Sequence, residues 1–350
     1  MFDDRWRGIA ERRFGKCGIQ YVILLFLSLP LMFACQLQSQ SQPPDEVKLQ
    51  LKWLHQAQFA GFYVAQEKGY YKAENINVTF MEGGQDIDIA RRVIAGEADF
   101  GVITPEFIFV ERSQGESLTA IAVIYRRSAA VFVSMFGSGI VRPQDFMGKT
   151  VATKDPGGAQ VDFEILFYAM MHKLGLDASK VKTIPYDPEY TGFYNGSVEV
   201  TPTYYTGGLI KMRQKGLKLN LIWPSDYGIH FYSDTLVTTG SMINNNPDLV
   251  ERFLRASLKG WQDAIEDYQQ AVSVTMKYAR IKDAGFQTAM LEAMLPLINT
   301  GEDHIGWMKP SEWQGMYEIL LEQGLLAMPV DVKEAYTMRF LESIYGSKIK

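Results

Sequence analysis

Residues 49–72 read LQLKWLHQAQFAGFYVAQEKGYYK, and the periodicity of the chain changes within this stretch. From Val47 to Trp53 apolar and polar residues alternate, which is the period of a half-buried strand. Residues 61–68 suit a helix, and Gly69 follows where helices often end. The folded part of the chain is therefore predicted to open with a strand, a loop at residues 55–59 and a helix.

Strand-like and helix-like segments continue to alternate after this opening, which is the signature of an α/β protein. The last third of the chain is mostly helical: Asn246 is expected to cap a helix, Pro247 fits its first turn, and helical periodicity returns after Pro310. The expected strands are residues 76–81, 99–104, 118–125, 131–136, 149–154, 181–186 and 219–223, and the expected helices include residues 86–95, 209–215 and a long one ending near 173.

The chain of 350 residues is longer than one hydrophobic core usually organises, so we expect two lobes. The first lobe is predicted to comprise residues 47–130 together with 236–350, and the second residues 131–235. Two crossover strands, near 128–137 and 229–240, are expected to join them. Because both lobes are α/β units, a ligand cleft is predicted between them.

The charge and the cysteines exclude several classes of protein. A net charge of −5 and a pI near 5.6 argue against a nucleic-acid partner. Cys17 and Cys35 are the only cysteines, so residues 36–350 hold neither a disulfide framework nor a cysteine metal site. A body without thiols suits an exported protein.

Catalytic motifs are absent from the sequence. The four histidines show no metal-ligand spacing, and neither HExxH nor Gly-x-Ser-x-Gly occurs. Gly148-Lys149-Thr150 resembles the end of a phosphate-binding loop, but Pro143 stands where that loop needs glycine. We therefore expect no enzyme activity, no cofactor and no metal, although any two of the 40 acidic residues could meet as an acid–base pair.

The first 46 residues are predicted to direct export and anchoring and not to form part of the folded body. Basic residues precede an apolar run at 21–34, which Pro30 interrupts and which is short for a membrane span. Residues 1–34 thus form a secretory signal, and Cys35 resembles the acylated cysteine of bacterial lipoproteins. Residues 35–46, rich in Gln, Ser and Pro, read as a flexible tether. An uncleaved anchor helix is the alternative, and both readings place the body outside the cytoplasm.

The stretch at 49–72 closely resembles the opening of the ABC substrate-binding proteins related to thiamine pyrimidine synthase. The resemblance continues at Gly83-Gly84-Gln85-Asp86-Ile87 and at residues 96–101, and resumes at 148–151 and 195–199. It implies a two-lobed type II periplasmic-binding-protein fold with two crossover strands. It also implies a monomer that binds a small aromatic or heterocyclic nutrient, such as a thiamine pyrimidine precursor, and delivers it to an ABC permease.

Two departures from the family pattern bear on function. The self-consuming pyrimidine synthases carry a cysteine-rich motif and a substrate-donating His, whereas Phe59 occupies the equivalent of that His here. Formylaminopyrimidine receptors typically show an Asn-Glu pair where this chain has Thr206-Gly207-Gly208. Alternatives therefore stay open: a riboflavin or sulfonate receptor of the same fold, a ligand-sensing module for a signalling partner, or a degenerate enzyme.

Candidate ligand contacts come from strand ends and from aromatic clusters. Ligands of open α/β sheets bind beyond the carboxyl ends of strands, so Trp53 and the loop after it should face the cleft. Thr104 and the segment Lys154–Gly157 each lead to a helix start rich in free N–H groups. Core packing or plain exposure is the alternative for each. The residues that we select as ligand contacts are Trp53, Gln58, Phe59, Thr104, Lys154, Gly157, Tyr186, Tyr204 and Tyr227.

Overall fold

The computed structural model describes residues 42–154, 162–301 and 303–346, and its folded unit begins at Pro44. The predicted signal (1–34), the lipidation residue Cys35 and most of the tether lie outside the described residues, as does Gly157. Within the described ranges, no helix combines the length and the apolar character that a membrane crossing requires.

The first of two mixed sheets has the strand order β2-β1-β3-β10-β4. β1 pairs in parallel with β2 and β3, whereas β10 runs antiparallel to β3 and β4. The bounds are β1 Asp45–Gln50, β2 Ile76–Met81, β3 Phe100–Ile103, β4 Leu118–Val123 and β10 Thr235–Thr239. The strand β10 is thus the segment with which the chain returns to the first sheet.

The second sheet has the order β7-β6-β8-β5-β9. β6 is parallel to β7 and β8, and β5 is antiparallel to β8 and β9. The bounds are β5 Ala130–Met135, β6 Thr150–Lys154, β7 Lys182–Pro185, β8 Val200–Tyr204 and β9 Leu219–Ile222. Two sheets with helices confirm the α/β class, and β5 and β10 fall where the crossovers were expected. The exact lobe boundaries stay a prediction.

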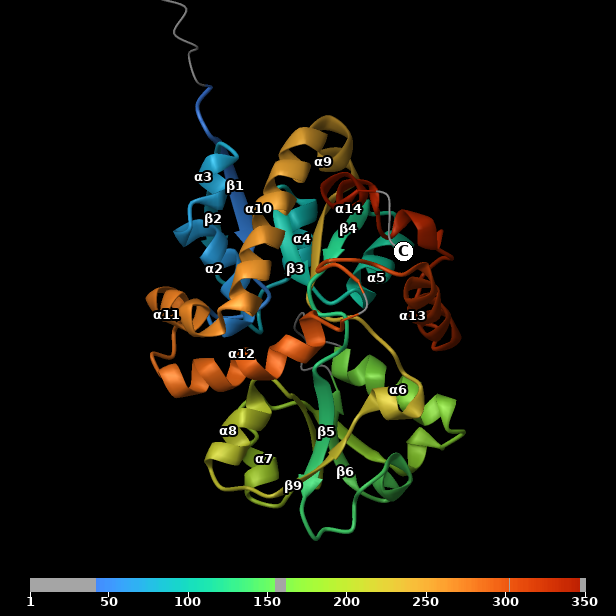
Figure 1. Cartoon of the computed structure of the whole chain (residues 1–350). Helices are drawn as coiled ribbons and strands as arrows, with labels where there is room; N and C mark the ends of the chain where they lie inside the picture. The colour runs from blue at the N-terminus through green and yellow to red at the C-terminus, as the bar shows by residue number, and fades with distance from the viewer. Residues whose placement is uncertain (1–41, 155–161, 302, 347–350) are drawn as a thin grey trace, which may run out of the picture. The chain divides into compact units, whose positions relative to one another are not determined.

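The helices pack around these sheets, and α12 lies between the two sheet-bearing halves in Figure 1. α12 contacts α8 of the second half as well as α11 of the first. The bounds are α2 Ala60–Glu67, α3 Tyr70–Ala73, α4 Ile89–Ile94, α5 Glu106–Ser113, α6 Asp162–Lys173, α7 Thr191–Tyr194, α8 Gly208–Gln214, α9 Gly240–Asn245, α10 Pro247–Glu266, α11 Tyr268–Tyr278, α12 Ala284–Ile298, α13 Pro310–Glu322 and α14 Arg339–Tyr345.

Three local features differ from the sequence-based expectation. β8 was not predicted, and it contains Pro202, which cannot donate a ladder hydrogen bond. The structure accommodates Pro202 because β6 pairs with β8 only at Val151 and Val200, so the ladder on that side has already ended. β1 ends at Gln50, and Trp53 therefore lies in the following loop. Asn246 precedes α10, but its side chain makes no capping hydrogen bond within the described part of the chain.

Candidate ligand-binding cleft

A cavity of about 100 Å³ lies between the two sheets and is lined from six segments of the chain. The loop after β1 contributes one wall, the two crossing segments another, and the second sheet's loops and α12 complete it. Six of the lining residues carry aromatic rings: Trp53, Tyr125, Tyr186, Tyr190, Tyr204 and Phe286. We call this space the ring-lined cavity. Its walls suit a flat apolar solute, and its tyrosine hydroxyls suit polar ring edges.

Four predicted contact residues line this cavity: Trp53, Gln58, Tyr186 and Tyr204. A fifth, Thr104, lines a much smaller neighbouring cavity of about 10 Å³. Trp53 follows β1 of the first sheet, and Tyr204 ends β8 of the second sheet 151 residues later. The fold therefore brings together candidate residues that lie far apart in the sequence. That they bind a ligand remains a prediction.

The other candidates are placed differently. Phe59 is fully buried in the hydrophobic core at the end of the short turn Ala57–Phe59, so its ring does not line the ring-lined cavity as described. Tyr227 ends the short helix Pro224–Tyr227 and is also absent from that lining. Lys154 is the last residue of β6. The physical reason for Phe59 is that its apolar ring is buried in the hydrophobic core of the first lobe.

The rings of the second sheet hold one another in position. Phe163 packs against Tyr204 and Tyr186, with ring centroids 4.8 and 5.0 Å apart. The hydroxyl of Tyr186 lies 3.1 Å from that of Tyr190, which in turn lies 2.8 Å from Thr203 Oγ1. A wall fixed by such contacts loses little conformational entropy when a ligand docks on it.

Lys52 is a lining residue that the sequence did not single out. It is 6% exposed, its Nζ lies 3.3 Å from the hydroxyl of Tyr204, and it sits above that ring at 4.8 Å from the centroid. The same ammonium lies 3.7 Å from Asp234 Oδ1. Since Lys52 follows β1 and Tyr204 ends β8, this contact joins the two halves across the cleft.

Asp234 connects the cleft to the crossing segments. Its Oδ2 accepts a 2.7 Å hydrogen bond from Gln58 Nε2, and its backbone oxygen accepts from the N–H groups of Ile124 and Tyr125. Burial raises the pKa of Asp234, and the Lys52 ammonium opposes that rise. Asp234 therefore connects Gln58 in the cleft with the backbone of the segment in which the chain crosses between the sheets.

Tyr204 donates a 2.5 Å hydrogen bond to Asp162 Oδ2 at the start of α6. Burial, and then the negative charge of Asp162, hold the pKa of Tyr204 well above its usual range. The phenol is therefore neutral at physiological pH and acts as a donor toward Asp162. This role leaves its lone pairs for the Lys52 ammonium.

α12 forms the remaining wall and is tied to the loop after β1. The backbone N–H of Ala57 donates to Gln287 Oε1 at 2.8 Å, and Gln287 is fully buried. The Lys211 ammonium lies 5.6 Å from the ring centroid of Phe286 on this helix. Contacts from α8 to α12 therefore form a second bridge between the two halves.

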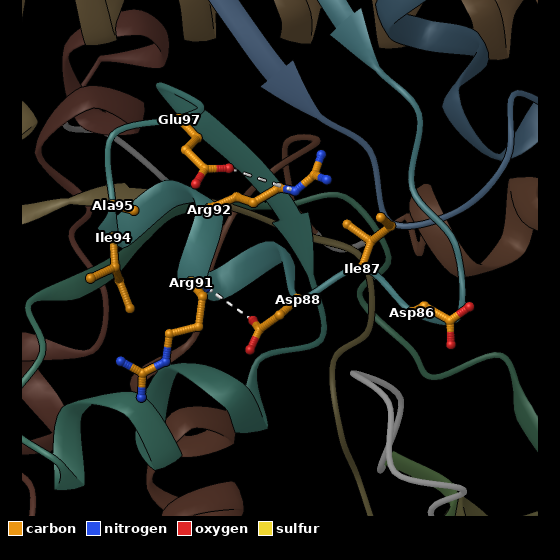
Figure 2. A pocket seen from close by; sticks show the side chains of 8 residues that line it. All are labelled: Asp86, Ile87, Asp88, Arg91, Arg92, Ile94, Ala95 and Glu97. Atoms are coloured by element: carbon orange, nitrogen blue, oxygen red, sulfur yellow. Dashed lines mark hydrogen bonds and ion pairs between the residues drawn. The ribbon is translucent and has the colours of Figure 1, made fainter.

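A larger hollow over α4 has a different character. Figure 2 shows eight side chains around it, with those of Arg91 and Arg92 pointing apart. Arg91 binds Glu116 at 3.2 Å, and Arg92 binds Gln50 Oε1 at 2.8 Å, so both guanidinium groups are already engaged. Most of the hollow's side chains are exposed or half-buried, and it lies on one lobe only. Among the described residues, no group of three His, Cys, Asp or Glu side chains could hold a metal ion.

Two α/β lobes joined by two crossings around a ring-lined cavity are the architecture of the type II periplasmic-binding-protein fold. The periplasmic aliphatic sulphonate binding protein SsuA of Escherichia coli has this fold, with a TM-score of 0.66 over 83% of this chain and 92% of that one at 14% identity. The chain belongs to the NMT1/THI5-like family, whose model matches residues 56–271.

Relatives at low identity include both binding proteins and enzymes. A riboflavin-binding protein, RibY of Chloroflexus aurantiacus, is 25% identical over 85% of this chain and 86% of its own length. A formylaminopyrimidine-binding protein of Halalkalibacterium halodurans is 21% identical, covering 90% and 97%. A 4-amino-5-hydroxymethyl-2-methylpyrimidine phosphate synthase of Legionella pneumophila is 22% identical, covering 87% and 95%. The family resemblance expected from residues 49–72 is therefore confirmed.

Proposed function

We propose that this protein is an extracytoplasmic solute-binding lipoprotein that captures a small aromatic or heterocyclic nutrient and delivers it to the permease of an ABC importer. The observation that carries the proposal is the ring-lined cavity between the two lobes, with Trp53 on one side and Tyr186 and Tyr204 on the other. The relatives named for riboflavin and formylaminopyrimidine binding support a flat heterocyclic solute. Cys35 would carry the acyl anchor.

Ligand capture works by closing the cleft. The contacts between Lys52 and Tyr204 and between Lys211 and Phe286 join the lobes, and opening would separate both pairs. A ligand stabilises the closed form only by the difference between its affinities for the two forms. A guest held between Trp53 and the tyrosines touches both lobes, so it favours closure. The closed monomer would then dock on the permease.

An enzyme of the pyrimidine synthase type is the second candidate, because one relative bears that name over most of both chains. Against it, residues 36–350 contain no cysteine, and Phe59, which stands at the position of the synthases' His, is fully buried. Incubation with pyridoxal phosphate and iron, followed by mass spectrometry of the small molecules, separates the two functions. A pyrimidine product would establish the enzyme.

Thermal-shift screening tests the binding function. The panel contains pyrimidines, flavins, sulfonates and polyamines, and each hit is followed by calorimetry. A ligand that binds only the native state raises the apparent melting temperature. We expect a pyrimidine or flavin to do so and to be recovered chemically unchanged. A panel without a single hit, or a hit that is converted to product, contradicts the proposal.

A further inference from the structure

A small cavity with both polar and apolar lining residues adjoins the ring-lined cavity. It encloses about 10 Å³, and Thr104 and Asp162 supply polar groups to its wall. Lys52 lines both cavities, so the two spaces meet at its side chain. A volume of this size accommodates one water molecule or one small polar group such as an amino group.

Buried carboxyl groups outnumber cations next to this small cavity, whose own wall includes Asp162 but neither Glu106 nor Asp234. Glu106 is the first residue of α5 in the first lobe, and Asp162 is the first residue of α6 in the second. They are 1% and 4% exposed, and Asp234 is 2% exposed. The ammonium of Lys52 lies among them and is already bound to Asp234 and Tyr204. Three buried carboxyl groups therefore share one buried ammonium in the described structure.

The hydrogen bonds show the same excess of carboxyl groups over cations. Both carboxyl oxygens of Glu106 and Oδ1 of Asp162 are buried without a hydrogen-bond partner in the described part of the chain. Burial, and then the charge of Asp162, raise the pKa of Glu106 to about 7, while Thr104 and Lys52 oppose the rise. Unsatisfied buried acceptors cost free energy, so this arrangement favours an occupant that brings N–H donors and positive charge.

We infer that the solute is a flat heterocycle bearing a protonated amino group, whose ammonium lies between Glu106 and Asp162 while its ring occupies the ring-lined cavity. This inference rests on the proposed function and adds the chemical class of the ligand. Because Glu106 and Asp162 come from opposite lobes, an ammonium between them also replaces their mutual repulsion by attraction to both. The charged group would thus determine specificity and favour closure together.

A matched pair of probes tests the inference. 4-Amino-5-aminomethyl-2-methylpyrimidine carries a protonated amine where 4-amino-5-hydroxymethyl-2-methylpyrimidine carries a hydroxyl, and benzylamine and benzyl alcohol form a second such pair. Calorimetry measures all four against the full-length protein at pH 7.5. We expect each amine to bind at least tenfold more tightly than its alcohol. Equal or weaker binding of both amines overturns the inference.

Three variants assign the preference to the two carboxyl groups. Glu106→Gln and Asp162→Asn should each reduce the ratio of amine affinity to alcohol affinity toward unity. Glu97→Gln is the control, since its side chain is 63% exposed on the same lobe as Glu106. If one cleft variant fails to fold, the other decides. A preference that persists in both folded variants overturns the inference.

The outcomes also distinguish this inference from the proposed function. If only alcohols or riboflavin bind, the amino-group subsite is ruled out, but the protein still binds a solute. A buried water would then occupy the small cavity. If none of the four probes binds, the inference fails, and the wider thermal-shift panel decides the proposed function by itself.

Discussion

The amide of Gln58 donates a 2.7 Å hydrogen bond to the carboxylate of Asp234, and this bond ties the loop after β1 to the crossing between the lobes. On the opposite side, the backbone oxygen of Asp234 accepts from Ile124, and Ser233 donates to Tyr125. The two crossing segments are thus bonded to each other next to the cleft. A solute that contacts Gln58 therefore contacts a side chain that is hydrogen-bonded to Asp234 of the crossing segment.

The first prediction follows from this bond. Asp234→Asn should lower the free energy of unfolding by about 1–3 kcal/mol, because the charged acceptor of the buried Gln58 hydrogen bond becomes a neutral amide. Lys52 then lies beside a neutral amide, whose single oxygen must serve both Lys52 and Gln58. Urea unfolding measured by circular dichroism checks this, with the exposed Asp226→Asn as the control. Equal stability of Asp234→Asn and the wild type would show that Asp234 is not a partner of Lys52.

The second prediction concerns Trp53, which lines the ring-lined cavity and is only half-buried. Trp53→Ala should weaken the binding of the best ligand from the screen by tenfold to a hundredfold, about 1.4–2.8 kcal/mol, because stacking area is lost. The melting temperature of the free protein should change little. Trp307→Ala is a control on the first lobe outside that lining. Unchanged affinity in Trp53→Ala by calorimetry would remove this residue from the site.

The third prediction is a pH dependence centred on Glu106. Its pKa in the folded protein is about 7, above the ordinary value of 4.5, so the folded state prefers the neutral acid. The stabilisation that this provides is fully present below pH 4.5 and is lost as the pH rises through 7. The groups facing Glu106 are Asp162, Lys52 and Thr104.

Glu106→Gln removes this titration. Between pH 5 and pH 8 the variant should gain stability relative to the wild type, by roughly 3 kcal/mol at most. Urea unfolding at four pH values gives the difference directly, since titrations elsewhere cancel in the subtraction. The same series with Glu97→Gln should run parallel to the wild type. A constant difference across the pH range would mean that Glu106 keeps an ordinary pKa.

The fourth prediction concerns the anchor. Cys35→Ser should release the protein from membranes into the soluble extracytoplasmic fraction, because a signal without its acylated cysteine leaves no lipid attached. Labelling with radioactive palmitate should mark the wild type and not the variant. Cys17→Ser serves as the control and should keep its label. If Cys35→Ser stays membrane-bound, the N-terminal segment is an uncleaved anchor.

The architecture was open to prediction where periodicity is strong. The strand and helix around residues 49–72 have clear periods, and the tyrosines at 186 and 204 carry rings with polar ends that suit a cleft. β8 was missed because its Thr-Pro-Thr segment lacks apolar alternation, although it lies inside the second sheet. Its identity as a strand comes from pairing with β5, which local sequence does not reveal.

The polar contacts of the cleft could not be predicted from the sequence, for a different reason. Lys52 occupies a position in an alternating segment that normally faces water, and only the folded arrangement buries it against Tyr204. Gln58 and Asp234 are 176 residues apart, so no local pattern connects them. Glu106 follows the candidate Thr104 by two residues, but its approach to Asp162 depends on how the two lobes meet.

The last prediction tests the packing of α2, which follows the cleft loop, against α10. α2 and α10 approach closely because Gly61 and Gly260 face each other: a Cβ on Gly260 would lie 2.2 Å from the backbone oxygen of Gly61 and 2.6 Å from Ala65 Cβ. Gly260→Ala must therefore push the helices apart, and we expect a loss of roughly 1–3 kcal/mol, with weaker ligand binding because α2 follows the loop that carries Trp53.

Gly315 in α13 supplies a matched control for that substitution. A Cβ there would meet nothing within 4 Å, so Gly315→Ala should be neutral or stabilise the protein by up to about 1 kcal/mol through helix propensity. Thermal unfolding of both variants, with calorimetry of the best ligand, makes the comparison. If Gly260→Ala melts at the wild-type temperature, the two helices tolerate a wider separation, and the contact between Gly61 and Gly260 does not position the loop.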